Sequence, residues 1–269
     1  MFENLLTKKL DIEFKEQSNC YTFEIFDFLT EQQYELLEKN FPEMDVYKAK
    51  KINKSFDDPD YQHKLKIFIT EVEKELFDNQ ILSNPVLKNF VETLKNPIFT
   101  DLLIKKLYFK ILKSRILDIS NFTKLLIRKN RAYQKRKNYF EKFCFNEIYT
   151  TAEWAYMFDG SDAWPHTDGK KKLVSLLLYF PDKTLSENQV NNLGTTFFDS
   201  NKYYSATSQI KNSSQAKKFR EENKSFTLPF KKRSLFGFIK SHKSWHGVNK
   251  IAIDQNFIRK NININLLLV

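Results

Sequence analysis

Apolar side chains recur every three or four residues through most of the first half of the chain. In the segment 30–41, apolar positions at Tyr34, Leu36, Leu37 and Phe41 follow Thr30, a residue suited to a helix N-cap. The same spacing predicts further helices, two of which begin at an Asn-Pro pair, at 60–77, 84–94, 96–112 and 121–143. The opening segment at 20–29 has an extended pattern instead.

From residue 146 onward the pattern changes to short runs of β-branched and aromatic residues, separated by turn-forming stretches. These runs predict strands at 146–158, 172–180, 194–200, 234–242 and 261–269. The series predicts an α+β chain whose strand-rich part is an antiparallel β-sandwich or open barrel. Because no flexible linker divides the chain, we expect a single domain, in which helix-rich residues 1–145 support a core at 146–269.

The last predicted strand has one polar face. With a period of two residues, Arg259, Asn261, Asn263 and Asn265 lie on the same side. An apolar core does not accept an arginine and three asparagines, so this face is either exposed at a sheet edge or lines a polar pocket. In a pocket, the forked and permanently charged guanidinium of Arg259 suits a carboxylate ligand.

Two polar stretches have less specific interpretations. Residues 199–225 contain few apolar side chains, which predicts a surface excursion between strands and leads to the hypothesis of a substrate-facing lid. Residues 128–142 interleave cations with aromatic side chains. We interpret this second pattern as the solvated face of an amphipathic helix in preference to a nucleic-acid-binding arm.

Composition narrows the class of protein. The chain has 269 residues, 41% of them hydrophobic, which is enough for a globular core, and a formal net charge of +11. Lysine, asparagine, isoleucine and phenylalanine are abundant throughout, so we attribute the charge to compositional bias and do not expect nucleic acid as a partner. Cys20 and Cys144 form no CxxC pair, and no apolar run has the length of a signal h-region or a membrane span. We therefore expect a cytoplasmic protein without a membrane partner.

Two short motifs carry candidate chemistry. In WPHTDG, His166 and Asp168 are one residue apart, so on an extended backbone both side chains face the same side and can offer two ligands to one ion. In KSWHGV, His246 is our preferred third ligand because of its Trp-His-Gly context, with His242 as the alternative. Two histidines and a carboxylate form the facial set of non-haem Fe(II) oxygenases, whereas a structural zinc site needs four protein ligands.

With these motifs in this order, the chain resembles the Fe(II)- and 2-oxoglutarate-dependent dioxygenase superfamily, in its prolyl 4-hydroxylase-like branch. The family pattern is HxD, then a distal histidine, then an arginine or lysine shortly after it, and here Arg259 follows His246. GTTFFDS and SLFGFIKSHKSWHGV resemble the family's strands before the distal histidine. FEIFDFLTEQQYELLEKNFPE resembles its entry strand and helix.

The resemblance implies a double-stranded β-helix, or jelly-roll, core. The implied iron ligands are His166, Asp168 and His246, with no catalytic side chains beyond them. Arg259 is implied to pair with the distal carboxylate of 2-oxoglutarate. Tyr156 and Asn261 are further candidate cosubstrate contacts, although Tyr156 is one position out of the family's register. The implied cofactors are Fe(II), 2-oxoglutarate as a small-molecule cosubstrate and O₂, with ascorbate as an additional candidate.

The implied reaction is hydroxylation of a substrate coupled to decarboxylation of 2-oxoglutarate to succinate and CO₂. The substrate class stays open among peptidyl residues, free amino acids, glycans and small metabolites, and no oligomeric state is predicted. Two alternatives remain: a catalytically silent jelly-roll that binds an anionic partner, and a nucleic-acid-directed oxygenase of the same fold. The complete set of His166, Asp168, His246 and Arg259 argues against the silent module, which has no need of it.

Overall fold

The computed structural model describes residues 1–17, 20–43, 64–68, 81–114, 148–169, 171–201, 210, 212–253 and 257–268. Within these ranges, seven strands form one antiparallel sheet in the spatial order β1-β2-β9-β6-β11-β4-β3. Their bounds are β1 Ile12–Gln17, β2 Cys20–Ile25, β9 Leu235–Ile239, β6 Lys172–Phe180, β11 Ile258–Leu268, β4 Ile148–Phe158 and β3 Lys64–Phe68. A second sheet has the order β5-β10-β7-β8, with bounds β5 Ala163–His166, β10 His246–Val248, β7 Thr196–Phe198 and β8 Ser225–Thr227.

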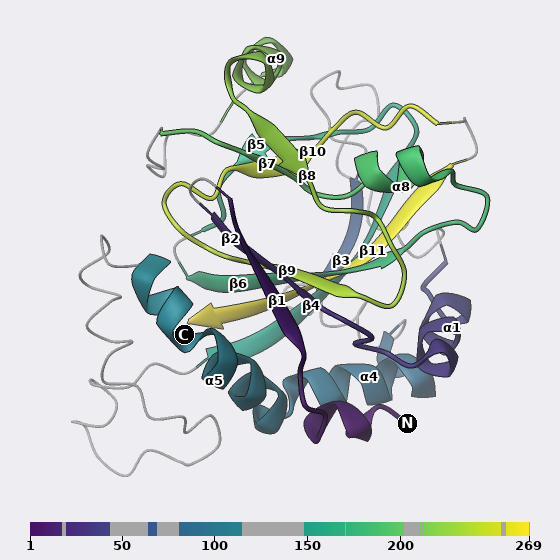
Figure 1. The fold of residues 1–269 in the computed structure, drawn as a ribbon. Coiled ribbons are helices and arrows are strands. Elements are labelled where there is room, and N and C mark those ends of the chain that lie inside the picture. Colours follow the sequence, from purple (N-terminus) through teal and green to yellow (C-terminus); the bar gives the residue numbers. More distant parts are fainter. Residues whose placement is uncertain are drawn as a thin grey trace.

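From β4 onward the chain passes back and forth between the two sheets. The large sheet receives β4, β6, β9 and β11, and the small sheet receives β5, β7, β8 and β10. Figure 1 shows the small sheet above the large one, with the strands of both facing a common interior. This arrangement is the double-stranded β-helix, or jelly roll, and it confirms the expected core. The strands β1, β2 and β3 extend the large sheet at its two edges.

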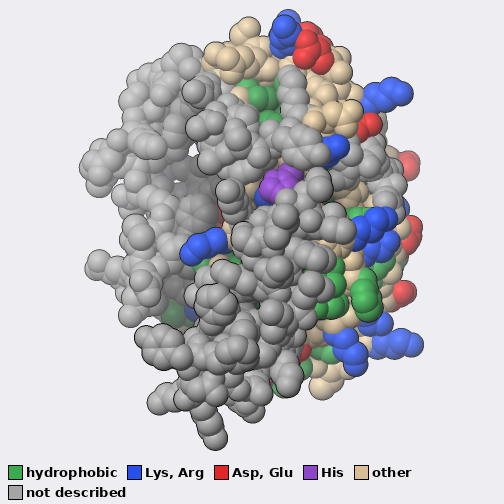
Figure 2. All heavy atoms as spheres, turned by 90° about the vertical axis from the view of Figure 1, so that its left-hand side faces the viewer, with side chains coloured by type: hydrophobic (Ala, Val, Ile, Leu, Met, Phe, Trp, Pro, Cys, Tyr) green, Lys and Arg blue, Asp and Glu red, His purple; other side chains and the backbone are tan. Residues whose placement is uncertain are grey.

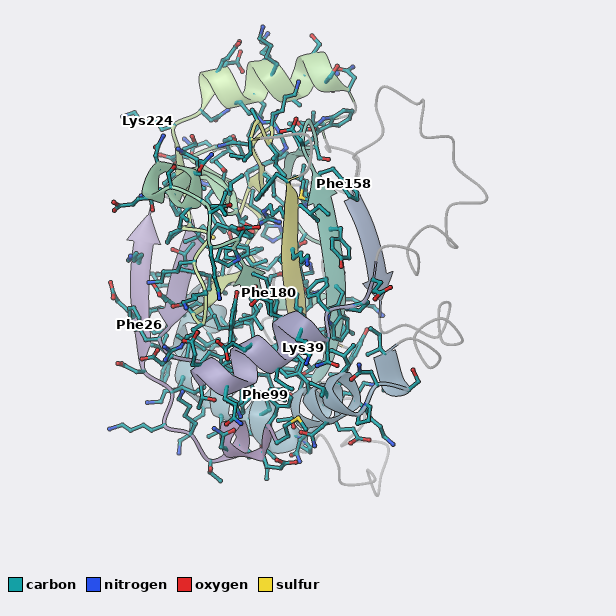
Figure 3. The ribbon with its side chains drawn as sticks, turned by 90° about the vertical axis from the view of Figure 1, so that its right-hand side faces the viewer. Phe26, Lys39, Phe99, Phe158, Phe180 and Lys224 are labelled. Carbon is teal, nitrogen blue, oxygen red and sulfur yellow. The ribbon has the colours of Figure 1, made fainter. Side chains whose placement is uncertain are left out.

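Helices cover the outer face of the large sheet. Figure 1 shows η1 (Glu3–Leu6), α1 (Glu31–Lys39), α4 (Pro85–Lys95) and α5 (Pro97–Ser114) on that side, and α8 (Glu187–Asn192) and α9 (Ser213–Glu222) near the small sheet. Figure 3 labels Lys39, at the end of α1, and Phe180, at the end of the strand β6 against which this helix packs. Tyr34 of the same helix stacks on Phe180, with ring centroids 5.1 Å apart. None of the helices in the described ranges combines the length and apolar character needed to cross a lipid bilayer.

The predicted helix starts at Thr30 and at the Asn-Pro pairs are confirmed. The Thr30 hydroxyl accepts a hydrogen bond from the Gln33 amide, and the Gln33 side chain accepts one from the Thr30 amide, which makes a capping box. The Asn84 side chain accepts hydrogen bonds from the first free amides of α4, and Pro85 occupies the first turn. These residues satisfy backbone donors that have no partner inside the helix.

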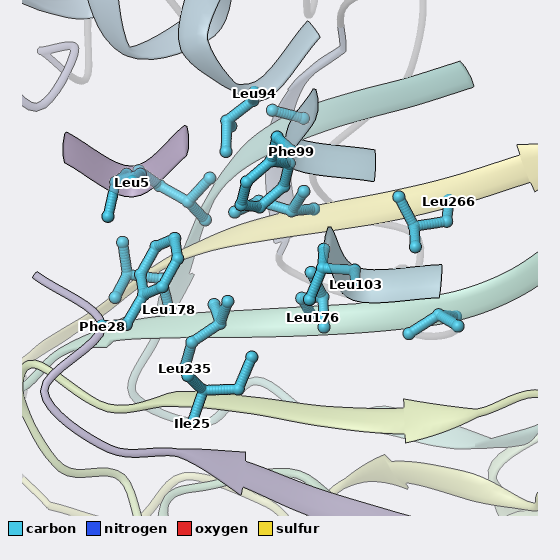
Figure 4. Close-up of a cluster of buried hydrophobic side chains, with 14 of the residues drawn as sticks. Leu5, Ile25, Phe28, Leu94, Phe99, Leu103, Leu176, Leu178, Leu235 and Leu266 are labelled. Atoms are coloured by element: carbon cyan, nitrogen blue, oxygen red, sulfur yellow. The ribbon is translucent and has the colours of Figure 1, made fainter. Parts of the chain in front are cut away.

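The main hydrophobic core lies between these helices and the large sheet. Figure 4 shows Leu94 and Phe99, from α4 and α5, in one cluster with Leu176 and Leu178 of β6 and Leu266 of β11. All five side chains are buried, and each such burial contributes about 1.5–3 kcal/mol. Because successive strand residues point to opposite faces, the alternate residues of β6 and β11 face the space between the two sheets.

One predicted helix is wrong. We expected a helix at 60–77, but Lys64–Phe68 forms the edge strand β3, which pairs with β4. The apolar residues Leu65 and Ile67 fit a period of two as well as a helical period, and β4 offers an unpaired backbone edge that this segment extends. The rest of 60–77 and the whole of the predicted helix at 121–143, with its basic stretch, lie outside the described residues.

Candidate metal centre

Three side chains from the two motifs converge at one end of the jelly roll. His166 ends β5, Asp168 follows two residues later, and His246 begins β10. Because β5 and β10 pair antiparallel with His166 opposite His246, two histidines 80 positions apart in sequence become neighbours. One ligand atom from each of the three residues lies within 4.8 Å of the others, which is close enough for all of them to hold one metal ion.

Both histidines are oriented by a backbone carbonyl two residues earlier. His166 Nδ1 lies 2.7 Å from Trp164 O, and His246 Nδ1 lies 3.0 Å from Ser244 O. A ring that donates from Nδ1 keeps the lone pair of Nε2 for a metal. Burial and the neighbouring His246 lower the pKa of His166 to about 3, so this imidazole is neutral near pH 7, as a metal ligand must be.

Asp168 is held by two side chains. Lys172 Nζ donates to Asp168 Oδ1 at 2.8 Å, and Ser175 Oγ lies 3.1 Å from Asp168 Oδ2. Burial alone would raise the pKa of Asp168, but Lys172 and the two histidines outweigh it and hold that pKa well below its usual range. The site therefore presents an ionised carboxylate and neutral imidazole, a donor set that fits Fe(II) with open coordination positions. Within the described part of the chain the cluster has three such residues, not the four of a structural zinc site.

The three candidate ligands line a cavity, and the polar face of β11 lines the same cavity. Arg259, Asn261, Asn263 and Asn265 all line it together with the three candidate ligands. Its volume of about 90 Å³ is enough for several water molecules. Because β11 lies between β6 and β4, it is a central strand, so its polar face is a pocket wall and not an exposed edge.

Arg259 is a buried cation without an acidic partner among the described residues. Its side chain is 2% exposed, Nε donates to Leu193 O at 2.7 Å, and Nη1 donates to Asn261 Oδ1 at 2.5 Å. The guanidinium carbon lies 5.1 Å from the ring centroids of both Tyr179 and Phe230. Aromatic faces and neutral oxygens only partly offset the cost of burying a charge. A carboxylate that enters the cavity would complete this environment.

Amide side chains connect Arg259 with the other end of the wall. Asn261 Nδ2 donates to Asn263 Oδ1 at 2.7 Å, and Asn263 Nδ2 donates to Glu153 Oε1 at 3.0 Å. Asn265 Oδ1 lies 3.1 Å from Ser175 Oγ, the hydroxyl that also contacts Asp168. Asn261 therefore uses its oxygen and one amide hydrogen within this row. Its contact with a cosubstrate stays a prediction.

The expectation for Tyr156 is wrong. This side chain lies on the opposite face of β4, where its hydroxyl donates to Pro42 O at 2.5 Å and its ring packs on Phe41 with centroids 5.2 Å apart. The alternation of the strand sends Glu153 into the cavity and Tyr156 away from it. Sequence reasoning missed Tyr179, whose ring lies beside Arg259, although a period of two in β6 places it on the cavity side.

The remaining predictions concern His242 and the stretch at 199–225. Among the described residues, His246 and not His242 joins the cluster. Within 199–225, α9 is anchored on the small sheet: Arg220 donates to Asp162 Oδ2 at 2.8 Å, and Phe219 packs on Trp245 with centroids 4.8 Å apart. Among the described residues, none of α9 lines the cavity, and 202–209 and 211 lie outside the described residues, so the lid stays a hypothesis.

No model of a known protein family matches the chain, and no curated protein matches it. Solved structures to which the chain is similar include a prolyl-4-hydroxylase from Pseudomonas putida, at 9% identity and a TM-score of 0.41, over 99% of this chain and 98% of that one. A second is a prolyl hydroxylase from Trichoplax adhaerens, solved with a peptide fragment of the hypoxia inducible factor oxygen degradation domain. It has 11% identity and a TM-score of 0.46, over 91% of this chain and 83% of that one.

A third similar structure is SnoK, a non-haem alpha-ketoglutarate-dependent carbocyclase from nogalamycin biosynthesis. It has 8% identity and a TM-score of 0.44, over 91% of this chain and 79% of that one. These three similarities concern the fold only. Any assignment of function to this chain therefore depends on the residues of its own cavity.

Proposed function

We propose that the chain is an Fe(II)- and 2-oxoglutarate-dependent dioxygenase that hydroxylates a substrate and converts 2-oxoglutarate to succinate and CO₂. One observation carries this proposal. The cluster of His166, Asp168 and His246 shares a cavity with Arg259, a buried cation with no acidic partner among the described residues. A metal site and a carboxylate site in one cavity suit a cosubstrate that chelates the metal at one end and carries a carboxylate at the other.

His166, Asp168 and His246 would hold Fe(II) in this proposal. Three protein ligands leave three positions of an octahedral ion for cosubstrate and O₂. When bound, the iron would supply the activation of O₂, with 2-oxoglutarate as the cosubstrate that is oxidised. The carbonyl contacts of both histidine rings and the Lys172 contact of Asp168 keep the three donor atoms turned toward one point.

Arg259 would bind the distal carboxylate of 2-oxoglutarate. The guanidinium is already oriented by Leu193 O and Asn261 Oδ1, so little side-chain entropy is lost when the ligand binds. Asn265 and Ser175 connect the same wall to Asp168. The asparagine row of β11 therefore extends from the proposed carboxylate contact toward the proposed metal.

The test is a turnover assay with protein purified without oxygen and loaded with Fe(II). We expect the protein to bind about one Fe(II) and to form succinate from 2-oxoglutarate and O₂, slowly even without its substrate. A matched sample loaded with Zn(II), which has no redox chemistry, should form none. If the protein binds no Fe(II) and forms no succinate, the proposal is wrong and the silent binding module remains.

The described residues on one face of the molecule give the anionic-partner alternatives no specific support. On the face drawn in Figure 2, lysine and arginine side chains of the described residues are interspersed with acidic ones and do not gather into one basic patch.

A further inference from the structure

The helix α9, within the stretch 199–225, has no task in the proposed reaction. Figure 1 shows it on the small sheet, which contains the two strands that carry the histidine ligands, β5 and β10. The helix contacts β5 directly, and none of its residues lines the cavity. Any effect of α9 on the metal ligands must therefore pass through these strands.

The pairing of β5 with β10 is irregular immediately beside the ligands. On the metal side, His246 pairs with His166. On the far side, Val248 pairs with Ala163. The two pairs are two residues apart along β10 (246 to 248) and three along β5 (163 to 166), so β5 carries one extra residue, a β-bulge. Pro165 lies within the bulge and has no amide hydrogen to donate, which weakens the ladder there.

Arg220 of α9 bonds to both strands at the far end of this bulge. Its Nη2 donates to Ala163 O and to Val248 O, at 3.3 Å each, and to Asp162 Oδ2 at 2.8 Å. Ala163 and Val248 are the pair that closes the bulge. One guanidinium nitrogen thus joins the two strands where their own hydrogen bonding is irregular, and its charge makes these bonds stronger than neutral ones.

The same helix also contacts the residue that precedes His246. Phe219 packs on Trp245 with ring centroids 4.8 Å apart, and Trp245 is buried. The helix therefore holds the chain on both sides of His246, through Trp245 before it and Val248 after it.

We propose that Arg220 is a positioning residue for the metal site. By holding the two carbonyls that close the bulge, it fixes the register of β5 and β10 and with it the separation of the His166 and His246 rings. Arg220 contacts neither the proposed ion nor the cosubstrate, so it acts only through the strands. This inference rests on the proposed function, because it concerns ligands of the proposed iron.

The contrasting role for Arg220 is an ordinary ion pair with Asp162. Both side chains are 23% exposed, and such pairs contribute little to stability. Two variants separate these roles. Arg220→Lys keeps the charge, but its nitrogen lies one bond closer to the backbone than Nη2, so it can pair with Asp162 and cannot also hold both carbonyls. Asp162→Asn removes the ion pair and leaves the carbonyl contacts.

The first test is anaerobic titration of the metal-free variants with Fe(II). We expect Arg220→Lys to lose about tenfold in affinity, as when a group that orients metal ligands is removed, and Asp162→Asn to keep the affinity of the unaltered protein. Lys218→Met is the matched control, because Lys218 lies on the same helix, is 76% exposed and pairs only with Glu222 of that helix. Unchanged affinity in Arg220→Lys, or a loss in Asp162→Asn alone, would overturn the inference.

The second test uses Co(II), whose visible absorption depends on the arrangement of its ligands. In protein saturated with Co(II), we expect the bands of Arg220→Lys to differ from those of the unaltered protein, and those of Asp162→Asn and Lys218→Met to coincide with them. A lower melting temperature in Arg220→Lys with an unchanged Co(II) spectrum would assign Arg220 to stability alone and overturn the inference.

Should Arg220→Lys not fold, hydrogen exchange of the unaltered protein decides. Because coupling between two sites is reciprocal, Fe(II) binding without oxygen should slow amide exchange in α9 as well as in β5 and β10. Exchange in α9 that does not respond to Fe(II) would contradict the inference.

The two proposals fail in different ways. If the unaltered protein binds no Fe(II), the proposed function fails and the inference fails with it. If the unaltered protein binds Fe(II) and Arg220→Lys binds it equally well, the inference alone is wrong.

Discussion

His166 and His246 lie directly opposite each other on β5 and β10, with imidazole centroids 4.4 Å apart. The register between these two short strands therefore sets the distance between two candidate metal ligands. The register is irregular immediately afterwards, between His246 and Val248. Small changes in the backbone at this point should alter metal binding without disrupting the large sheet.

Replacement of Gly247 tests this dependence on the backbone. A Cβ at Gly247 would lie 2.4 Å from Ala163 O on the paired strand, so Gly247→Ala must push β10 away from β5. We expect Fe(II) affinity to fall about tenfold or more, measured by anaerobic titration, since groups that orient ligands affect metal affinity by about 10- to 100-fold. Gly169→Ala is the control, because a Cβ there meets nothing within 4 Å although the residue adjoins Asp168. Unchanged Fe(II) affinity in Gly247→Ala would contradict the prediction.

Asp168→Ala should remove the carboxylate ligand and abolish measurable Fe(II) binding. The loss should exceed about 100-fold, the upper end of what removing a ligand-orienting group costs. Iron content after anaerobic loading and desalting measures it, and circular dichroism checks that the fold is retained. Asp182→Ala is the control, because Asp182 is an exposed aspartate outside the cluster. A variant at Asp168 that keeps its iron would show that another carboxylate is the ligand.

Arg259→Ala should weaken the use of 2-oxoglutarate. We expect the apparent KM for 2-oxoglutarate to rise roughly 10- to 100-fold, because hydrogen bonds to charged groups contribute about 1.5–3 kcal/mol. Lys260→Ala is the control, since the neighbouring side chain faces the opposite side of β11 and its Nζ lies over the Phe41 ring. If Arg259→Ala lowers the melting temperature but leaves the KM unchanged, Arg259 has a structural role only.

The metal-free protein should lose stability on acidification below pH 6.5. The pKa of His166 is lowered from 6.5 to about 3 on folding, so between these values the unfolded chain binds a proton that the folded chain does not. Stability therefore rises with pH through this window, by up to about 1.4 kcal/mol per pH unit. The lowered pKa of Asp168 acts in the same direction at lower pH.

Urea unfolding of the metal-free protein at several pH values between 4.5 and 7.5 measures this slope. His166→Asn should make the slope shallower, because the side chain that is kept neutral is gone. Equal slopes for the unaltered protein and His166→Asn would contradict the prediction.

Strands with strict alternation were predictable from sequence. The polar face of β11 was recognisable because Arg259 and the three asparagines recur with a period of two, and all four line the cavity. The convergence of Asp168 with His246 followed from motif order, since an antiparallel fold can return a distant strand to the same end. Helix starts were predictable because Thr30 and Asn84 carry local capping information.

Other features depend on contacts that no local pattern encodes. The strand β3 exists because the long strand β4 offers an edge, and its own apolar spacing fits a helix equally well. The error at Tyr156 is a matter of one residue in register, since a single step along β4 reverses the face on which a side chain lies. The hydrogen bond from Asn263 to Glu153 crosses a strand pair, so it is visible only once β4 and β11 are placed together.

The two faces of β11 limit the kinds of sequence change that this strand can accept in evolution. Ile262, Ile264 and Leu266 belong to the helix-covered core, and Arg259 and Asn261 belong to the cavity. A single-residue insertion or deletion in this strand would exchange the two sets, placing asparagines in the core and isoleucines in the cavity. Loss of folding and loss of the site would then coincide, so variation in β11 should occur by substitution, while length changes accumulate in the connections between strands.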